Sequence, residues 1–202
     1  MTDSRQQSML EDRKLTVFLQ RHIDGLLSPH SEPRPACFHC GSAQQNRLPS
    51  HLFPTFRCSA CRKVFNRRTG TSFTLVRVKS LPRMRGLIRY LSLPLPYSQL
   101  SEVFGVMDEQ IMSWRDVFER VANWLEPDGS LSARIRIGAT PGTNSPCLFC
   151  GRVGVAKRFD QHVWNCTGCG RLFSMRRVVV ERNGRLEILN VHPDDAPGEA
   201  LF

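Results

Sequence analysis

Eight cysteines, arranged as two quartets with the same internal spacing, most constrain what this chain can fold into. Each quartet is a C-x-x-C pair, a gap and a second C-x-x-C pair, and the gaps hold 17 and 15 residues. Four thiolates in two such pairs match a closed tetrahedral zinc site, so we expect two structural Zn²⁺ ions. The predicted ligands are Cys37, Cys40, Cys58 and Cys61 for the first ion, and Cys147, Cys150, Cys166 and Cys169 for the second.

The segments around the two quartets are copies of one unit. An aromatic residue stands two positions before the third cysteine of each quartet, as Phe56 and Trp164. A phenylalanine stands four positions after the fourth cysteine, as Phe65 and Phe173. This internal repeat predicts two zinc ribbons, each a small β-sheet held by two cysteine knuckles.

Other uses of the cysteines fit less well. Disulfides need an oxidising compartment, and the polar start of the chain lacks the apolar segment of a signal peptide. A thioredoxin-like redox motif uses one C-x-x-C beside a βαβ pattern, which is not seen here. His39 lies between two cysteines, but Cys40 already completes that pair, so His39 is predicted to be a surface imidazole. Without a signal peptide, the chain is expected to be cytoplasmic.

Charge is unevenly distributed along the 202 residues, whose formal net charge is +10. No Asp or Glu occurs from Pro33 to Ser101, whereas that window contains twelve Lys and Arg residues. Each zinc held by four thiolates carries a charge of −2, which lowers the net charge to about +6. A concentrated field of one sign favours a polyanionic ligand, most simply nucleic acid. A solvated basic face that aids solubility is the alternative.

The hydrophobic content of 41% and the mean hydropathy of −0.29 indicate a soluble, globular chain. No stretch approaches the roughly 18 apolar residues of a membrane-spanning helix, so we expect no membrane contact.

Helical spacing of apolar residues predicts helices over 9–27 and 82–92. The first would pack against the body of the protein or mediate dimerisation. Alternating apolar residues predict strands over 72–78 and 131–137, and Asn183-Gly184 predicts a hairpin between 178–182 and 185–189.

Residues 97–126 have the pattern of two helices joined by a tight turn. Ser98 is predicted to cap a short helix that ends at Gly105, because glycine readily adopts the left-handed conformation. Asp108 is predicted to cap a second helix, whose apolar residues recur at helical spacing as far as Leu125. Together with the helix at 82–92, this order predicts a three-helix helix-turn-helix unit.

The second helix of a helix-turn-helix enters the major groove of DNA. Gln110 and Ser113 are the outward side chains predicted to contact base edges there. Four acids occupy the same helix, among them Asp108 and Glu109, and carboxylates are unfavourable near phosphates. A three-helix packing unit is therefore the alternative.

The basic four-cysteine ribbon, the segment Phe65–Phe73 and the Ser98…Gly105-Val106…Trp114 pattern resemble the DNA-binding subunits of bacterial insertion-sequence transposases. They also resemble transposon-associated bacterial proteins of unknown function. The resemblance covers roughly residues 36–126. It implies DNA binding at the ends of a mobile element, or a regulatory activity.

The expected fold class is α+β, with small zinc-stapled domains: two four-cysteine ribbons that flank the helix-turn-helix unit. The predicted domains are an N-terminal helix and linker (1–35), the first ribbon (36–80), the helix-turn-helix (81–126), a strand and linker (127–146), the second ribbon (147–191) and a tail (192–202).

The sequence thus predicts a non-enzymatic, zinc-binding DNA-binding protein of the transposase-accessory or transcriptional-regulator type. A cytoplasmic DNA-binding chain of this kind would be associated with the nucleoid. The predicted DNA contacts are Arg62, Lys63, Arg67, Arg68, Arg77, Lys79, Arg83, Arg85, Arg89, Gln110, Ser113 and Arg115. A nuclease or complete transposase would need clustered carboxylates for two metal ions, and none stands out. The alternative is a scaffold that docks on RNA polymerase or another partner, because a ribbon is a fold and not an activity. A protein partner could bind the second ribbon or the N-terminal helix, and the sequence does not indicate the oligomeric state.

Overall fold

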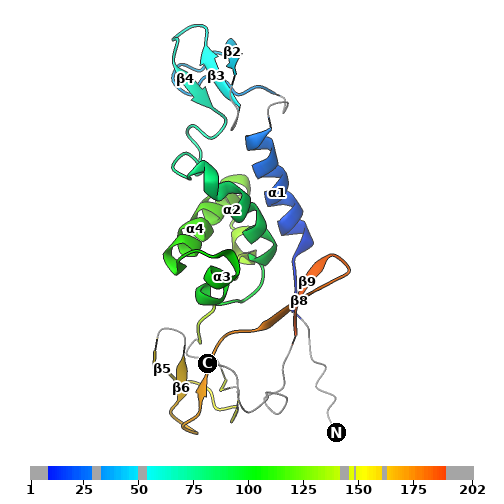
Figure 1. Cartoon of the computed structure of the whole chain (residues 1–202), viewed down its shortest axis with the longest axis vertical. Coiled ribbons are helices and arrows are strands. Elements are labelled where there is room, and N and C mark those ends of the chain that lie inside the picture. The colour runs from blue at the N-terminus through cyan, green and yellow to red at the C-terminus, as the bar shows by residue number, and fades with distance from the viewer. Residues whose placement is uncertain are drawn as a thin grey trace. The chain divides into compact units, whose positions relative to one another are not determined.

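The computed structural model describes residues 9–28, 33–49, 54–141, 146–147, 149–160 and 163–189. Contacts divide the chain into two compact units, each discontinuous in sequence. Unit 1 consists of Met1–Arg13, Arg89–Arg115 and Arg134–Phe202, and unit 2 consists of Lys14–Ile88 and Asp116–Ala133. In the described part, four α-helices and three small antiparallel sheets confirm the predicted α+β class (Figure 1). None of the described helices is both long enough and apolar enough to cross a bilayer.

The first predicted ribbon is a three-stranded antiparallel sheet in unit 2. Its strands are β2 (Gln45–Leu48), β3 (Thr55–Cys58) and β4 (Val64–Asn66), with β3 in the centre (Figure 1). Phe56 pairs with Phe65 across β3 and β4, and their ring centroids lie 5.8 Å apart. Both rings are buried in one cluster with Cys37 and Cys58. The apolar core of this sheet is therefore built directly against two of the cysteines.

The helices of unit 2 are α1 (Arg13–Leu27), α2 (Leu81–Leu87) and the part of α4 (Asp108–Leu125) that follows residue 115. The 3₁₀ helices η1 (Val78–Ser80) and η2 (Ile88–Tyr90) precede and follow α2. The apolar stripe predicted within 9–27 is confirmed, because Leu15, Leu19 and Ile23 of α1 are buried. Arg85 of α2 donates two hydrogen bonds to Asp24 of α1, at 2.8 and 3.0 Å. This pair is half exposed, so it contributes orientation more than stability.

The strand predicted over 72–78 is wrong, because this segment forms successive turns around the side chain of Arg68. Arg68 is only 6% exposed. Its guanidinium donates to the carbonyl of Phe73 at 2.9 and 3.1 Å, and also to those of Thr74 and Val76. The apolar residues do not share one face either, since Phe73 is buried while Leu75 is 94% exposed. Hydrogen bonds to one arginine thus replace those of a neighbouring strand.

Unit 1 contains α3 (Tyr97–Phe104) and the start of α4. Gly105 ends α3 in the left-handed conformation, with φ 59° and ψ 49°, as predicted. The predicted cap at Ser98 is wrong: Pro96 occupies the N-cap position, and no side chain caps this helix. Leu100 of α3 and both Ile111 and Trp114 of α4 are buried.

The strand predicted over 131–137 is also wrong. The 3₁₀ helix η3 (Ser132–Arg134) interrupts it. The amides of Arg136 and Ile137 donate to the carbonyl of Leu91, at 2.6 and 3.3 Å, and the amide of Gly138 donates to that of Leu95 at 2.8 Å. The segment therefore lies against a loop rather than a strand, and its isoleucines are buried without any sheet.

The third sheet combines both ends of the described chain, in unit 1. Its strands are β1 (Met9–Leu10), β9 (Arg185–Leu189) and β8 (Val178–Arg182), in that order. The predicted hairpin β8–β9 is confirmed, and Asn183 and Gly184 at its tip have φ values of 52° and 67°. Positive φ at both positions is the signature of a type I′ turn. Sequence reasoning did not predict β1, which pairs with Glu187 and Ile188.

Glu11, directly after β1, ties this sheet to η2. Its side chain is nearly fully buried, and the carboxylate accepts a hydrogen bond from the amide of Leu186 at 2.9 Å. Arg89 donates to the same carboxylate at 3.3 Å and to Glu181 at 3.1 Å. A buried carboxylate needs such partners, because desolvation of an unpaired charge costs several kcal/mol. Arg89 is therefore part of the framework of unit 1.

The second ribbon repeats the sheet of the first. Its strands are β5 (Ala156–Arg158), β6 (Trp164–Cys166) and β7 (Leu172–Phe173), with β6 in the centre. Trp164 pairs with Phe173 just as Phe56 pairs with Phe65 in the first ribbon. The internal repeat predicted from the sequence is therefore also a repeat of strand register.

We expect the substitution Arg68→Met to lower the free energy of unfolding by about 2–3 kcal/mol, because buried carbonyls lose a charged donor. Chemical denaturation measures this change, and hydrogen exchange should locate the loss of protection in residues 71–77. Arg77→Met removes an exposed arginine from the same segment and is the matched control, with an expected change below about 0.5 kcal/mol. Equal effects of the two substitutions would contradict this assignment.

Candidate metal centres

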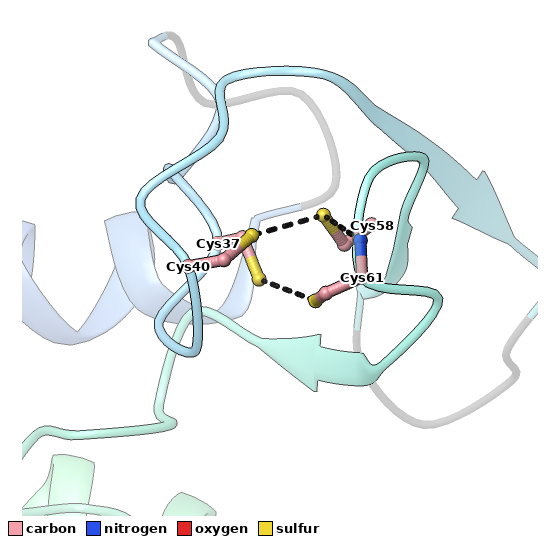
Figure 2. Close-up of side chains that lie close together, drawn as sticks. All are labelled: Cys37, Cys40, Cys58 and Cys61. Carbon is pink, nitrogen blue, oxygen red and sulfur yellow. Dashed lines mark hydrogen bonds between the residues drawn. The ribbon is translucent and has the colours of Figure 1, made fainter.

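The first tetrad joins two turns of the first ribbon. Cys37 and Cys40 lie in the turn before β2, Cys58 ends β3, and Cys61 follows in the turn that leads to β4 (Figure 2). The Sγ atoms of Cys37 and Cys61 are 3.6 Å apart, and so are those of Cys40 and Cys58. Cys37 and Cys58 are buried, whereas Cys40 is exposed. The four sulfurs thus converge on one point between the turns, at the edge of the sheet.

The second tetrad has the same construction. The Sγ atoms of Cys147 and Cys169 are 3.9 Å apart, and those of Cys150 and Cys166 are 3.7 Å apart. In each tetrad all four sulfur atoms lie within 4.8 Å of one another. The predicted grouping of the eight cysteines into two tetrads is therefore confirmed.

Both tetrads fit a tetrahedral metal ion. A Zn–S bond of about 2.3 Å places neighbouring corners of a regular tetrahedron about 3.8 Å apart, close to the observed separations of 3.6 to 3.9 Å. A disulfide would require about 2.05 Å, and all eight thiols are free. Each tetrad could hold one metal ion through four thiolates. Such a set leaves no coordination position for water or substrate, which is typical of structural sites.

Each cysteine knuckle contains a residue in the left-handed conformation. The amide of this residue donates to the carbonyl of the first cysteine of its pair, at 2.7 to 3.1 Å. The four residues are Gly41, Arg62, Gly151 and Gly170, with φ values of 72°, 62°, 69° and 73°. Three of them are glycines, for which a positive φ costs little, but Arg62 carries a side chain there. Of these four residues, Arg62 alone has a Cβ atom at a positive φ.

The pKa values of Cys58 and Cys40 in the first tetrad are shifted in opposite directions. The backbone amide of Cys61 is the main cause that lowers the pKa of Cys58 to about 6. For Cys40 the amide of Ser42 acts to lower the pKa, but the neighbouring thiols and burial raise it to about 12. Cys58 therefore loses its proton readily, whereas the deprotonation of Cys40 is unfavourable, because adjacent anions repel one another. A divalent cation at the centre removes this repulsion, as a metal site requires.

The predicted nucleic-acid contacts of the first ribbon differ in exposure. Arg62 and Lys63 are exposed in the turn between β3 and β4. Arg67 donates to the carbonyl of Pro33 at 3.0 Å and lies 5.7 Å from the centre of the Phe56 ring. Arg68 is buried under the turns that it holds, so in this structure it is a framework residue rather than a phosphate contact. Arg62 and Lys63 are the prominent basic side chains of this turn.

The predicted contacts after the ribbon also divide into two groups. Arg77, Lys79 and Arg83 are exposed. Arg85 and Arg89 instead form the ion pairs with acidic side chains described above, which occupy their guanidinium groups. The first three extend the basic surface of unit 2, whereas the last two mainly hold helices and strands together.

The predicted base-reading residues belong to unit 1, unlike Arg62 and Lys63. Gln110 and Ser113 are exposed on the first turns of α4, and Arg115 is half-buried on the same helix.

Two exposed basic residues of the ribbon sheet, Arg47 in β2 and Arg57 in β3, were missed by sequence reasoning. Arg57 lies in the central strand between Phe56 and Cys58, both buried, so its side chain points to the opposite face. Its register neighbours on that face, Asn46 and Val64, are exposed as well. The buried–exposed–buried alternation around Arg57 was the available signal, since side chains alternate between the faces of a strand.

Comparison with known proteins gives one partial match. A family model described as Domain of Unknown Function (DUF746) matches residues 83–146. The matched span covers α3, α4 and most of α2, and it ends directly before Cys147. No curated protein and no solved structure matches the chain significantly.

We expect the protein to bind two metal ions per chain, and Cys58→Ser to reduce this to one, because three thiolates hold zinc far more weakly. Native mass spectrometry counts the ions. Hydrogen exchange should show loss of protection in residues 45–66 but not in 164–173. Cys166→Ser is the matched control and should give the reverse result. Retention of both ions in either variant would contradict the assignment.

Proposed function

We propose that this chain is a non-enzymatic DNA-binding protein whose two ribbons are each held by a structural zinc ion. Zinc is favoured because four thiolates in tetrahedral array suit this soft, divalent, redox-inert cation. The surface proposed to contact DNA is the first ribbon, with Arg57, Arg62 and Lys63 at its centre. The observation that carries the proposal is the backbone conformation of Arg62.

Arg62 occupies a position where its side chain brings a structural cost. Its φ of 62° is unfavourable by about 1 kcal/mol or more for a residue with a Cβ atom, and the equivalent residue of the second ribbon is Gly170. The same backbone hydrogen bond forms in both knuckles, so the fold requires the conformation but not the arginine. A side chain that strains the backbone, at a position where glycine would serve the fold, indicates a functional site. An exposed guanidinium next to Lys63 is well suited to phosphate oxygens.

The charge of the surrounding chain supports the same ligand. Residues 33–101 contain no carboxylate, so no acidic neighbour in sequence opposes a phosphate at this ribbon. Exposed bases continue after the ribbon at Arg77, Lys79 and Arg83. A positive surface of this kind binds the DNA backbone without reading its sequence, and specificity requires further contacts.

The helix-turn-helix predicted from the residue spacing is supported by the order of α2, α3 and α4 along the chain, with Gly105 between the last two. We therefore propose that the protein acts in the cytoplasm on nucleoid DNA, as a transposition accessory or a transcriptional regulator. The first turn of α4 carries Asp108 and Glu109. These carboxylates oppose phosphates, so we assign DNA contact to the first ribbon rather than to this helix.

Binding of the zinc-loaded protein to a labelled random-sequence duplex, followed by fluorescence anisotropy at several salt concentrations, tests the proposal. We expect affinity to fall steeply with salt, with a slope of log K against log salt on the order of −3. A flat salt dependence would exclude phosphate contact as the source of binding.

The substitution Arg62→Gly should separate function from structure. It should weaken DNA binding and make the salt slope shallower by about 1, while thermal stability stays the same or rises. Arg158→Ala, which removes an exposed arginine from the second ribbon, is the control for net charge and should have a smaller effect. Equal losses for the two variants would show that the contact is not localised in the first ribbon.

A further inference from the structure

The segment that contains α3 and the start of α4 has the opposite charge character to the first ribbon. Residues 90–114 include no Lys or Arg, although the whole chain has 28. They include three acids, which are Glu102, Asp108 and Glu109, and Glu102 forms an ion pair with Arg176. Asp108 and Glu109 therefore give the start of α4 an acidic surface in a protein that is strongly basic as a whole.

The turn between α3 and α4 is also hollowed and apolar. Val106, Met107, Glu109, Gln110 and Ser113 line a shallow hollow of about 500 Å³. We call this surface the α3–α4 corner. Met107 is 75% exposed at its rim. Exposed methionine side chains are flexible and polarisable, and they adapt to apolar partners in protein-binding grooves.

The helices on either side of the turn carry two more exposed apolar side chains. Val103 of α3 is 55% exposed, and Met112 of α4 is 45% exposed. Exposed apolar surface of this kind is a mark of protein-binding sites. DNA is a poor occupant, because its phosphates would meet Asp108 and Glu109 with no basic residue of this segment to offset them.

We propose that the α3–α4 corner binds a partner protein through an amphipathic helix that carries basic and apolar residues. The apolar side of such a helix would enter the hollow beside Met107, as helices enter grooves in other proteins. Its Lys or Arg residues would lie against the carboxylates of Asp108 and Glu109. The inference goes beyond DNA binding and does not depend on it. It replaces the base-reading activity that the sequence predicted for Gln110 and Ser113.

The test uses the full-length zinc-loaded protein and a fluorescent designed helix of lysine and leucine with one apolar face. An equivalent helix with glutamate in place of lysine and a duplex with photoreactive bases are the comparison probes. We expect the cationic helix to bind and to protect residues 103–113 from hydrogen exchange. The acidic helix should bind at least about tenfold more weakly.

The double variant Met107→Ser with Glu109→Gln should weaken binding of the cationic helix at least about tenfold, because it removes both the apolar rim and a charge. Leu75→Ser removes a highly exposed apolar side chain elsewhere and is the matched control, with an expected change below about twofold. Circular dichroism confirms that both variants are folded.

Five results would overturn the proposal. Four of them are no binding of the cationic helix, equal binding of the acidic helix, equal effects of the two sets of substitutions, and protection of the corner by self-association without peptide. Photocrosslinking of the duplex to residues 103–113 would overturn it in favour of base reading.

Discussion

The convergence of four sulfur atoms on one centre is the interaction on which each ribbon depends. The strands of the two ribbons are two to four residues long, and their buried clusters contain only three or four residues, cysteines included. Sheets of this size do not bury enough apolar surface to be stable alone. A metal ion held by the four thiolates would supply the missing free energy of folding. The aromatic pairs Phe56–Phe65 and Trp164–Phe173 then complete the packing around the sulfurs.

Features marked by a recognisable residue spacing could be predicted from the sequence, whereas features that depend on which group a segment pairs with could not. The cysteine tetrads, the turn at Gly105 and the hairpin tip at Asn183 are each marked by residue types at a fixed spacing. The segments 72–78 and 131–137 alternate like strands, but their hydrogen-bond partners are Arg68 and the loop at Leu91–Leu95. The pairing of β1 with β9 joins residues far apart in sequence, and two residues give too short a pattern to detect.

The two ribbons share the backbone contacts that hold them together but differ in their exposed side chains. Strand register, knuckle hydrogen bonds and sulfur geometry are nearly the same in both. Side chains that these contacts do not constrain have diverged, as Arg62 and Gly170 demonstrate. In the same chain, basic and acidic residues are sorted into different segments, the first ribbon and the α3–α4 corner. Such sorting fits a protein that holds two ligands of opposite charge at once.

The sheet that contains β1 and β9 affects the order in which the protein forms during translation. The first ribbon has all its strands and all four cysteines once residue 66 has left the ribosome, so its tetrad could take up a metal ion early. Residues 9–11 must wait, because the strand and the amide that they bind lie at 185–189. The carboxylate of Glu11 stays hydrated on the nascent chain until the amide of Leu186 has been synthesised. The sheet of unit 1 therefore closes after the first ribbon, around a segment that was made long before its partner strand.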